Sequence, residues 1–230
     1  MSDISWRSVV RPGTDGDGAS LRLAGLAGIV LYPVFALTVV LLTWLEWDFM
    51  YGTGWTVMHE HKVNYPSTLA LGNFGFVQSM NFLLLGLLAA VLGLGLRTQF
   101  THRWSGWVAT AGIAAVGLSG LFSAFVTDLP GEPVSWHGLV HGIGFLLLML
   151  GSVITSVGSG LALRGASGWR GYWVYSLATT PLALAISAVT SSLGQVSFYA
   201  LITVLLTWYM VMGLRLRQLA NPVNRSDNLK

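Results

Sequence analysis

The sequence predicts an all-α integral membrane protein built as a bundle of six transmembrane helices. Hydrophobic residues make up 53% of the 230 residues and charged residues only 9%, whereas a water-soluble domain carries roughly a quarter charged residues. The few charges lie between long apolar runs rather than within them. Because a helix needs ~20 apolar residues to cross a bilayer, runs of this length are typical of multi-pass proteins. We therefore expect a multi-pass protein of the cell membrane.

Six apolar runs are long enough to cross a bilayer. They are residues 23–45, 70–96, 106–127, 136–163, 171–193 and 196–214. The first run is too long for a cleavable signal peptide and lacks a small-residue cleavage site, so we expect it to stay in the membrane. Most connections are short, which predicts antiparallel neighbours in one domain over residues 21–217.

The remaining segments are polar or mixed. Residues 1–20 are too poor in hydrophobic residues to pack, so they are predicted to form a disordered cytoplasmic segment, and residues 218–230 a cytoplasmic tail. The outer loop 46–69 is long and rich in Trp and Tyr. Such aromatics favour a lid at the lipid interface or a packed re-entrant cap. Glu46 is expected to be an interface charge.

The cations predict the orientation of the chain. Eleven of the twelve fall on one side of the six predicted spans, and only Lys62 falls on the other. By the positive-inside rule, both termini are therefore predicted to be cytoplasmic. The eleven are Arg7, Arg11, Arg22, Arg97, Arg103, Arg164, Arg170, Arg215, Arg217, Arg225 and Lys230. These short clusters flank the membrane, so they do not indicate nucleic-acid binding.

Small residues predict where the helices approach each other closely. Gly112, Val116 and Gly120 lie one turn apart in the third run, and residues 151–159 of the fourth run contain Gly, Ser and Thr. In lipid, small faces let backbones approach, and dispersion and interhelical hydrogen bonds replace the hydrophobic effect. We expect these faces to be buried in the bundle.

The strongest candidate for chemistry is a pair of histidines at the start of the fourth run. His137 and His141 are four residues apart, so a helix places both imidazoles on one face, as in many metal sites. Asp128 ends the preceding run, and the Pro-Gly turn that follows returns the chain to His137. The trio is therefore a candidate catalytic or metal site, with zinc as a possible ion. The alternative is structural hydrogen bonding by each residue.

Two amides extend this candidate site. Gln78 and Asn81 are three residues apart and share a helix face at a similar depth. Amides facing lipid would be left without hydrogen-bond partners, so we expect both to face the bundle. Together with Asp128, His137 and His141 they predict a polar pocket that opens outward.

The other histidines are weaker candidates. His59 and His61 lie in the outer loop, where they are either metal ligands or part of a solvated stretch. His102 lies on the opposite side of the bilayer beside Arg103. A bis-histidine haem is unlikely, because residues at i and i+4 cannot ligate opposite faces of a porphyrin and no other predicted span contains a histidine.

One stretch of the chain resembles a known family. Its matching segments are Leu71-Gly72-Asn73-Phe74-Gly75-Phe76-Val77-Gln78 with Asn81-Phe82, then Val126-Thr127-Asp128-Leu129-Pro130-Gly131, then His137-Gly138. In these segments the sequence is similar to the bacterial and archaeal membrane-protein family called domain of unknown function 998. The resemblance covers residues 67–163 and implies a membrane protein of six or seven helices. It implies no particular activity.

These observations lead to a functional hypothesis with one open alternative. We expect a membrane enzyme that takes a lipid-like or isoprenoid substrate from the bilayer into the outward-facing pocket. The reaction would be metal-assisted hydrolysis or acid–base catalysis, with Asp128, His137, His141, Gln78 and Asn81 as site residues. The alternative is a non-enzymatic subunit, transporter or ligand-binding protein. Membrane lipids are the expected partners.

Overall fold

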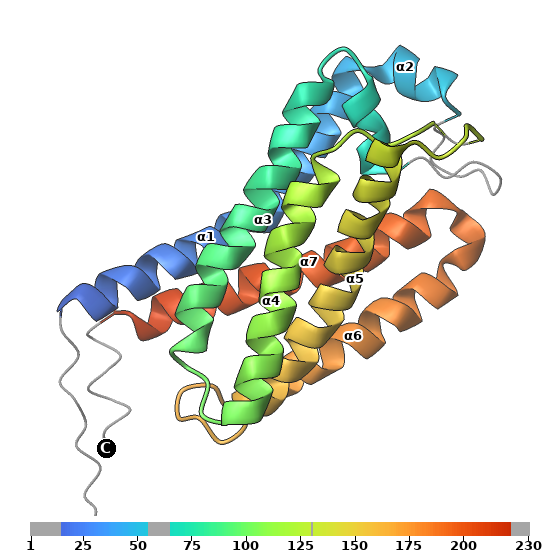
Figure 1. Cartoon of the computed structure of the whole chain (residues 1–230). Coiled ribbons are helices and arrows are strands. Elements are labelled where there is room, and N and C mark those ends of the chain that lie inside the picture. The colour runs from blue at the N-terminus through green and yellow to red at the C-terminus, as the bar shows by residue number, and fades with distance from the viewer. Residues whose placement is uncertain (1–14, 55–64, 130, 222–230) are drawn as a thin grey trace, which may run out of the picture.

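The computed structural model describes residues 15–54, 65–129 and 131–221, and these residues form a helical bundle (Figure 1). Six helices are long and apolar enough to cross a membrane, and no strand occurs in the described ranges. The predicted fold class, an all-α bundle of six potential membrane-spanning helices, is therefore confirmed. The helices are α1 Asp15–Leu45, α2 Trp47–Gly52, η1 Pro66–Leu71, α3 Gly75–Arg97, α4 Arg103–Ser123, α5 Trp136–Ala162, α6 Tyr172–Val189, η2 Ser191–Leu193 and α7 Gln195–Leu219.

The boundaries differ from the predicted ones mainly where polar residues continue a helix. α1 begins at Asp15, so the segment 15–20 is helical rather than disordered. α7 ends at Leu219, five residues beyond the predicted span of 196–214. The predicted outer loop 46–69 is partly helical as well, because it contains α2 and the first residues of η1.

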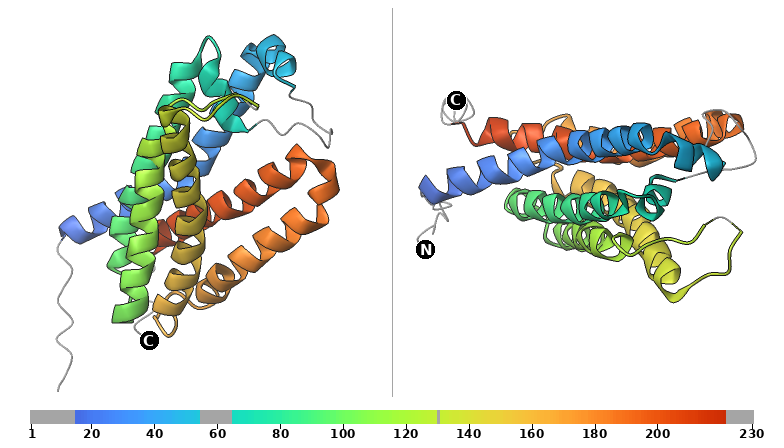
Figure 2. Two further views of the ribbon diagram at one scale, coloured as in Figure 1. Left: turned by 45° about the vertical axis from the view of Figure 1, so that its right-hand side comes forward. Right: turned by 90° about the horizontal axis from the view of Figure 1, so that it is seen from above.

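Each long helix packs mainly against two others, which links the six into a ring, and α3 also touches α7 across it. The order of neighbours is α1, α3, α4, α5, α6 and α7, with α7 returning to α1. Seen from above, α1, α6 and α7 lie in one layer and α3, α4 and α5 in the other (Figure 2). We call the end of the bundle with α2, η1 and residues 124–129 and 131–135 the cap end. The opposite end, with residues 97–103 and 163–171, is the arginine end.

Glycines bring the helix backbones into contact at three of the interfaces in this ring. A methyl group added at Gly213 of α7 would lie 2.7 Å from the backbone N of Ile29 in α1. One added at Gly112 of α4 would lie 2.6 Å from the backbone N of Thr155 in α5. Gly86 and Gly120 meet in the same way between α3 and α4. The predicted small faces are therefore buried, and backbone contact holds these helix pairs together.

Hydrogen bonds between side chains tie α6 to the helices on either side of it. The Ser156 hydroxyl of α5 lies 2.8 Å from the Thr180 hydroxyl of α6. The indole N–H of Trp208 in α7 donates to the Ser176 hydroxyl of α6 at 2.9 Å. Since these groups lie in the membrane-spanning part, pairing them avoids the cost of an unsatisfied polar atom.

The arginine end is held by contacts between its loops. The backbone N–H of Thr101 donates to the carbonyl oxygen of Ala162 at 3.1 Å, and the Arg215 Nε donates to the carbonyl oxygen of Gly168 at 2.7 Å. These bonds join the α3–α4 connection to the end of α5, and the α5–α6 connection to α7.

The close contact of α3 with α4 predicts a position-specific effect of one methyl group. At Gly120 an added methyl would overlap the Phe82 carbonyl and lie 2.8 Å from the Cα of Gly86, whereas at Gly117 its nearest neighbour is the Ala90 Cβ at 3.5 Å. Gly120→Ala should therefore destabilise the bundle by about 1–3 kcal/mol through overpacking. Gly117→Ala, three residues earlier on the same helix, should change the free energy of unfolding by no more than about 0.5 kcal/mol.

Thermal unfolding of the two variants in detergent measures this difference. Equal melting temperatures for Gly117→Ala and Gly120→Ala would show that α3 and α4 do not meet at Gly120.

Candidate functional site

Asp128 organises the turn that leads into α5. Its carboxylate accepts hydrogen bonds from the backbone N–H of Ser135 at 2.9 Å and from the Ser135 hydroxyl at 2.6 Å. The same hydroxyl accepts from the backbone N–H of Gly138 at 3.0 Å, which makes Ser135 the N-cap of α5. A methyl group at Gly138 would collide with the Asp128 carboxylate. Asp128 therefore supports the start of α5 through the N-cap.

His137 belongs to the same turn. Its Nδ1 lies 3.0 Å from the carbonyl oxygen of Val126 and 2.8 Å from the Ser135 hydroxyl. Since a carbonyl only accepts, Nδ1 carries the proton and donates it. The distance from Nδ1 to the Asp128 carboxylate is 3.8 Å, and the His137 side chain is 39% exposed. His137 is thus a partly exposed residue that steadies the turn.

The two hydrogen bonds from Ser135 determine the charge state of Asp128. Bonds from the Ser135 hydroxyl and N–H favour the carboxylate form, and nearby His137 adds a smaller effect of the same sign, so the pKa of Asp128 lies below its ordinary value. Asp128 is therefore an anion at neutral pH and is poorly suited to be a proton donor there.

His141 lies one turn further into α5 and in a different environment. Only 7% of the residue is exposed, and its Nδ1 lies 2.8 Å from the carbonyl oxygen of Phe125. The carbonyl requires Nδ1 to donate, which leaves the lone pair of the neutral imidazole on Nε2. The ring packs edge-to-face on Phe82, with 5.7 Å between ring centroids. His141 therefore offers a basic nitrogen in an apolar setting.

The predicted trio does not converge on a single point. The turn before α5 takes up both oxygens of Asp128 and the Nδ1 of His137 in hydrogen bonds. The Nδ1 of His141 is hydrogen-bonded to the carbonyl oxygen of Phe125. Across residues 15–54, 65–129 and 131–221, no three His, Asp or Glu side chains are placed so that they could hold a metal ion. The geometry thus gives the zinc hypothesis no support.

The two predicted amides pair with each other and with α1. Gln78 is fully buried and Asn81 is 5% exposed, so both face the bundle as predicted. The Asn81 amide donates to the carbonyl oxygen of Phe35 at 3.2 Å and to the Gln78 Oε1 at 3.3 Å. Neither side chain lines the pocket described below. They join α3 to α1 instead of forming a second polar wall.

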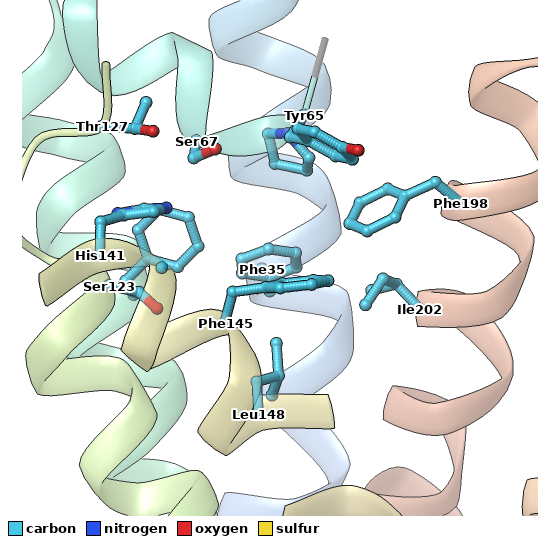
Figure 3. Close-up of a pocket in the computed structure, with 13 residues that line it drawn as sticks. Phe35, Tyr65, Ser67, Ser123, Thr127, His141, Phe145, Leu148, Phe198 and Ile202 are labelled. Atoms are coloured by element: carbon cyan, nitrogen blue, oxygen red, sulfur yellow. The ribbon is translucent and has the colours of Figure 1, made fainter. Parts of the chain in front are cut away.

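A pocket of about 280 Å³ lies inside the cap end of the bundle (Figure 3). One end of it is polar and is formed by His141 of α5 with hydroxyl-bearing Ser67, Ser123 and Thr127. The other end is apolar and reaches α7, where Phe198 and Ile202 face Phe145 and Leu148 of α5. Phe35 and Phe82 complete the wall from α1 and α3. The pocket therefore has a polar end and an apolar end.

This pocket differs in composition from the predicted one. Of the five predicted site residues, only His141 lines it. Sequence reasoning missed the apolar residues, because aromatic and aliphatic side chains in a membrane span are ordinary and carry no signal of their own. It also missed Ser67, Ser123 and Thr127, because Ser67 of η1 meets the other two, at and just after the end of α4, only after folding.

Glu46 differs from its predicted role as an interface charge. It is 5% exposed, and its Oε1 accepts a hydrogen bond from the backbone N–H of Phe74, the residue that precedes α3. Gly72 leaves the space for this carboxylate, since a methyl group there would overlap it. A carboxylate at this position is stabilised by the N-terminal end of the α3 dipole. Glu46 thus joins the end of α1 to the start of α3.

Of the remaining histidines, the structure describes only His102. His59 and His61, predicted as possible metal ligands, lie outside the described residues. His102 lies at the arginine end, where its Nε2 is 3.0 Å from the carbonyl oxygen of Arg164.

The capping role of Asp128 predicts how stability changes with pH. Because its pKa is lowered by folding, the carboxylate stabilises the folded state above its ordinary pKa, and this contribution is lost as the pH falls through the lowered value. Asp128→Asn should therefore melt at a lower temperature than the wild type at pH 7, and the gap should close in acid.

Melting temperatures of both proteins between pH 7 and strongly acidic pH test this expectation. Glu132→Gln is a matched control, because Glu132 is an exposed acid in the same turn. A gap between Asp128→Asn and the wild type that stays constant with pH would contradict an ionised cap.

Comparison with other proteins adds no functional information, since no family model, curated protein or solved structure matches this chain.

Proposed function

We propose that this protein takes up a lipid-like or isoprenoid molecule from the bilayer into the cap-end pocket, where His141 acts on its polar end as hydrogen-bond acceptor and general base. The observation that carries the proposal is the environment of His141. Its Nδ1 is tied to the Phe125 carbonyl, and its ring faces a pocket that is otherwise mostly apolar. A neutral imidazole held in this tautomer accepts a proton or a hydrogen bond at Nε2.

The two-ended pocket matches an amphipathic ligand. A hydroxyl, carbonyl or carboxylic acid group would lie among His141 and the nearby hydroxyl groups, while a hydrocarbon chain would lie between Phe145 and Phe198. The volume of about 280 Å³ is near the lower limit of the ~300–1,000 Å³ typical of ligand pockets. It suits one polar group with part of a chain, and the rest of the chain would extend toward the bilayer.

Three aromatic rings mark the route by which such a chain would enter. Tyr65, Phe145 and Phe198 pack together, with 4.7 Å between the ring centroids of Tyr65 and Phe198 and 6.0 Å between those of Phe145 and Phe198. They connect the residue before η1 with α5 and α7, and they line the pocket from its apolar end. Tyr65 and Phe145 are also partly exposed, at 45% and 37%. Movement of these rings would open the pocket to lipid.

Acid–base chemistry is better supported than metal-assisted hydrolysis. Hydrolysis through zinc needs several converging donors, and Asp128 and His137 are engaged in the turn before α5. Proton transfer needs one base close to the substrate, a role that His141 fills alone.

Binding without turnover is the second candidate function, and one observation favours it. His141 is oriented by a backbone carbonyl, whereas many catalytic histidines are oriented by a carboxylate that stabilises the imidazolium. With Asp128 directed to Ser135, proton abstraction by His141 lacks that stabilisation. A ligand-binding or transport protein would use the same pocket.

The direction in which we expect the pocket to face follows from the cations. The arginine end carries Arg97, Arg103, Arg164 and Arg170, so the positive-inside rule supports a cytoplasmic arginine end and an outward-facing cap end in the cell membrane. The resemblance to domain of unknown function 998 agrees with a multi-helix membrane protein and assigns no activity.

Replacing His141 should weaken binding of a ligand with a polar end. Detergent-purified protein would be photolabelled with a diazirine-bearing isoprenoid alcohol and, in parallel, with the corresponding diazirine-bearing hydrocarbon. Losing one hydrogen bond costs roughly 0.5–1.5 kcal/mol, so His141→Phe should reduce labelling by the alcohol about two- to twelvefold. Labelling by the hydrocarbon should change little.

His137→Phe is the matched control, because His137 lies one turn away and outside the pocket. Mass spectrometry of the recovered alcohol distinguishes the two candidate functions, since only an enzyme converts it. Equal labelling of His141→Phe and wild type by the alcohol would remove His141 from the binding site.

The aromatic contact predicts that the size of residue 198 controls access from lipid. The native chain has no cysteine, so Ser123→Cys places a single thiol in the pocket. A membrane-soluble pyrene maleimide should label this thiol faster when Phe198→Ala is added and slower when Phe198→Trp is added. The reason is that access requires the ring at 198 to move aside.

Phe76→Ala is the control for this experiment, because Phe76 is 70% exposed on α3 and away from the pocket. If the Ser123→Cys thiol is labelled at the same rate with Phe, Ala or Trp at position 198, lipid does not enter the pocket beside α7.

A further inference from the structure

A second cavity, of about 160 Å³, lies at the arginine end where α3 passes into α4. Its lining includes Arg97, His102, Arg103, Trp107 and Thr110. It is separate from the cap-end pocket and shares no lining residue with it. Two guanidinium groups and an imidazole in one small cavity form a site with a positive charge.

No carboxylate neutralises this charge in the part of the chain that the structure describes. Within residues 15–54, 65–129 and 131–221, the one ion pair is that between His137 and Asp128 at the cap end. Arg97 instead places its guanidinium over the ring of Trp107, 4.6 Å from the ring centroid. This contact orients the arginine and leaves its N–H groups available to an anion.

The cavity is also held in shape by hydrogen bonds to the end of α5. Both the backbone N–H and the hydroxyl of Thr101 donate to the carbonyl oxygen of Ala162, at 3.1 and 2.9 Å. The His102 Nε2 lies 3.0 Å from the carbonyl oxygen of Arg164. A site fixed in this way loses little conformational entropy when a ligand binds.

The first turn of α4 adds hydrogen-bond donors. His102 occupies the N-cap position and makes no side-chain capping bond. The initial N–H groups of a helix point outward from its N-terminus and attract anions. In α4 they lie beside the same arginines that line the cavity.

The position of the cavity in the bundle indicates where the anion comes from. Arg97 ends one predicted membrane span and Arg103 begins the next, so both lie at the depth of lipid headgroups. Trp104 and Trp107 are 84% and 52% exposed beside them, as expected of residues at the membrane interface. Phosphate is the anionic group that bilayer lipids present at this depth.

We propose that this cavity binds the phosphate of an anionic phospholipid headgroup through Arg97 and Arg103, with the α4 N-terminus and His102 completing the site. The lipid would hold the α3–α4 connection at the membrane surface. This site is independent of the function proposed for the cap-end pocket.

Native mass spectrometry of the full chain in detergent tests the proposal. Phosphatidylglycerol and phosphatidylcholine with identical acyl chains are added separately, and the lipid that stays bound is counted. The wild type should retain one phosphatidylglycerol in preference to phosphatidylcholine. Since one arginine near the headgroups contributes about 1 kcal/mol, Arg97→Gln and Arg103→Gln should each weaken retention about fivefold.

Arg170→Gln is the matched control, because Arg170 is an exposed arginine at the same end of the bundle but outside the cavity. Arg97 and Arg103 are exposed as well, so their replacement should leave the melting temperature of lipid-free protein unchanged. Equal losses in all three variants would show general attraction to the basic surface and would overturn the site.

Inorganic phosphate distinguishes the source of the anion. If the site is built for a lipid, excess inorganic phosphate should fail to displace phosphatidylglycerol from the wild type. If phosphate displaces the lipid completely and binds alone in an Arg97-dependent manner, the cavity recognises phosphate but its ligand is the free ion, which overturns the lipid assignment.

Discussion

The close approach of helix backbones at glycine is the constraint on which the rest of the structure depends. Lipid offers no hydrophobic gain to helices that associate, so dispersion between backbones and a few interhelical hydrogen bonds must hold the ring of six together. Gly213 brings α7 against α1, Gly120 brings α4 against α3, and Gly112 brings α4 against α5. Around the cap-end pocket, the facing residues of α1, α3, α5 and α7 include Phe35, Phe82, Phe145 and Phe198 instead. Large rings keep these helices apart, and the pocket lies in the space that remains among them.

The second constraint is that polar groups at membrane depth need partners. The Asn81 amide donates hydrogen bonds to the Phe35 carbonyl and to the Gln78 Oε1. The two oxygens of Asp128 accept hydrogen bonds from Ser135. These residues therefore stabilise the structure, and their cost of burial is offset locally. The hydrogen bond of His141 uses only one of its two ring nitrogens. His137 also bonds through Nδ1 alone, so what separates the candidate functional histidine from its neighbour is that His141 lines the pocket and His137 does not.

The two ends of the bundle have opposite chemical characters. At the cap end, a mostly apolar pocket contains one imidazole and a few hydroxyl groups, which suits a neutral or weakly polar end of a lipid-like molecule. At the arginine end, Arg97 and Arg103 lie without an ion pair among the described residues, which suits a phosphate. Lipids are therefore the ligands that we propose for both sites.

The sequence by itself determined the six membrane-crossing helices, the small-residue faces along which α4 and α5 pack, and the burial of Gln78 and Asn81. These properties follow from the length of apolar runs, the spacing of small residues along a helix and the cost of an unpaired amide in lipid, all of which are local. Only the tertiary structure decided what the polar residues do. The spacing of His137 and His141 predicted one shared site. In the structure, Asp128 and His137 are hydrogen-bonded to Ser135 at the N-cap of α5, whereas His141 is hydrogen-bonded to the carbonyl oxygen of Phe125. Likewise, Glu46 is buried against the start of α3, and the pocket combines residues of α1, α3, α4, α5, α7 and η1. Which hydrogen bonds form depends on which segments meet, and that is a property of the packed bundle rather than of any stretch of the chain.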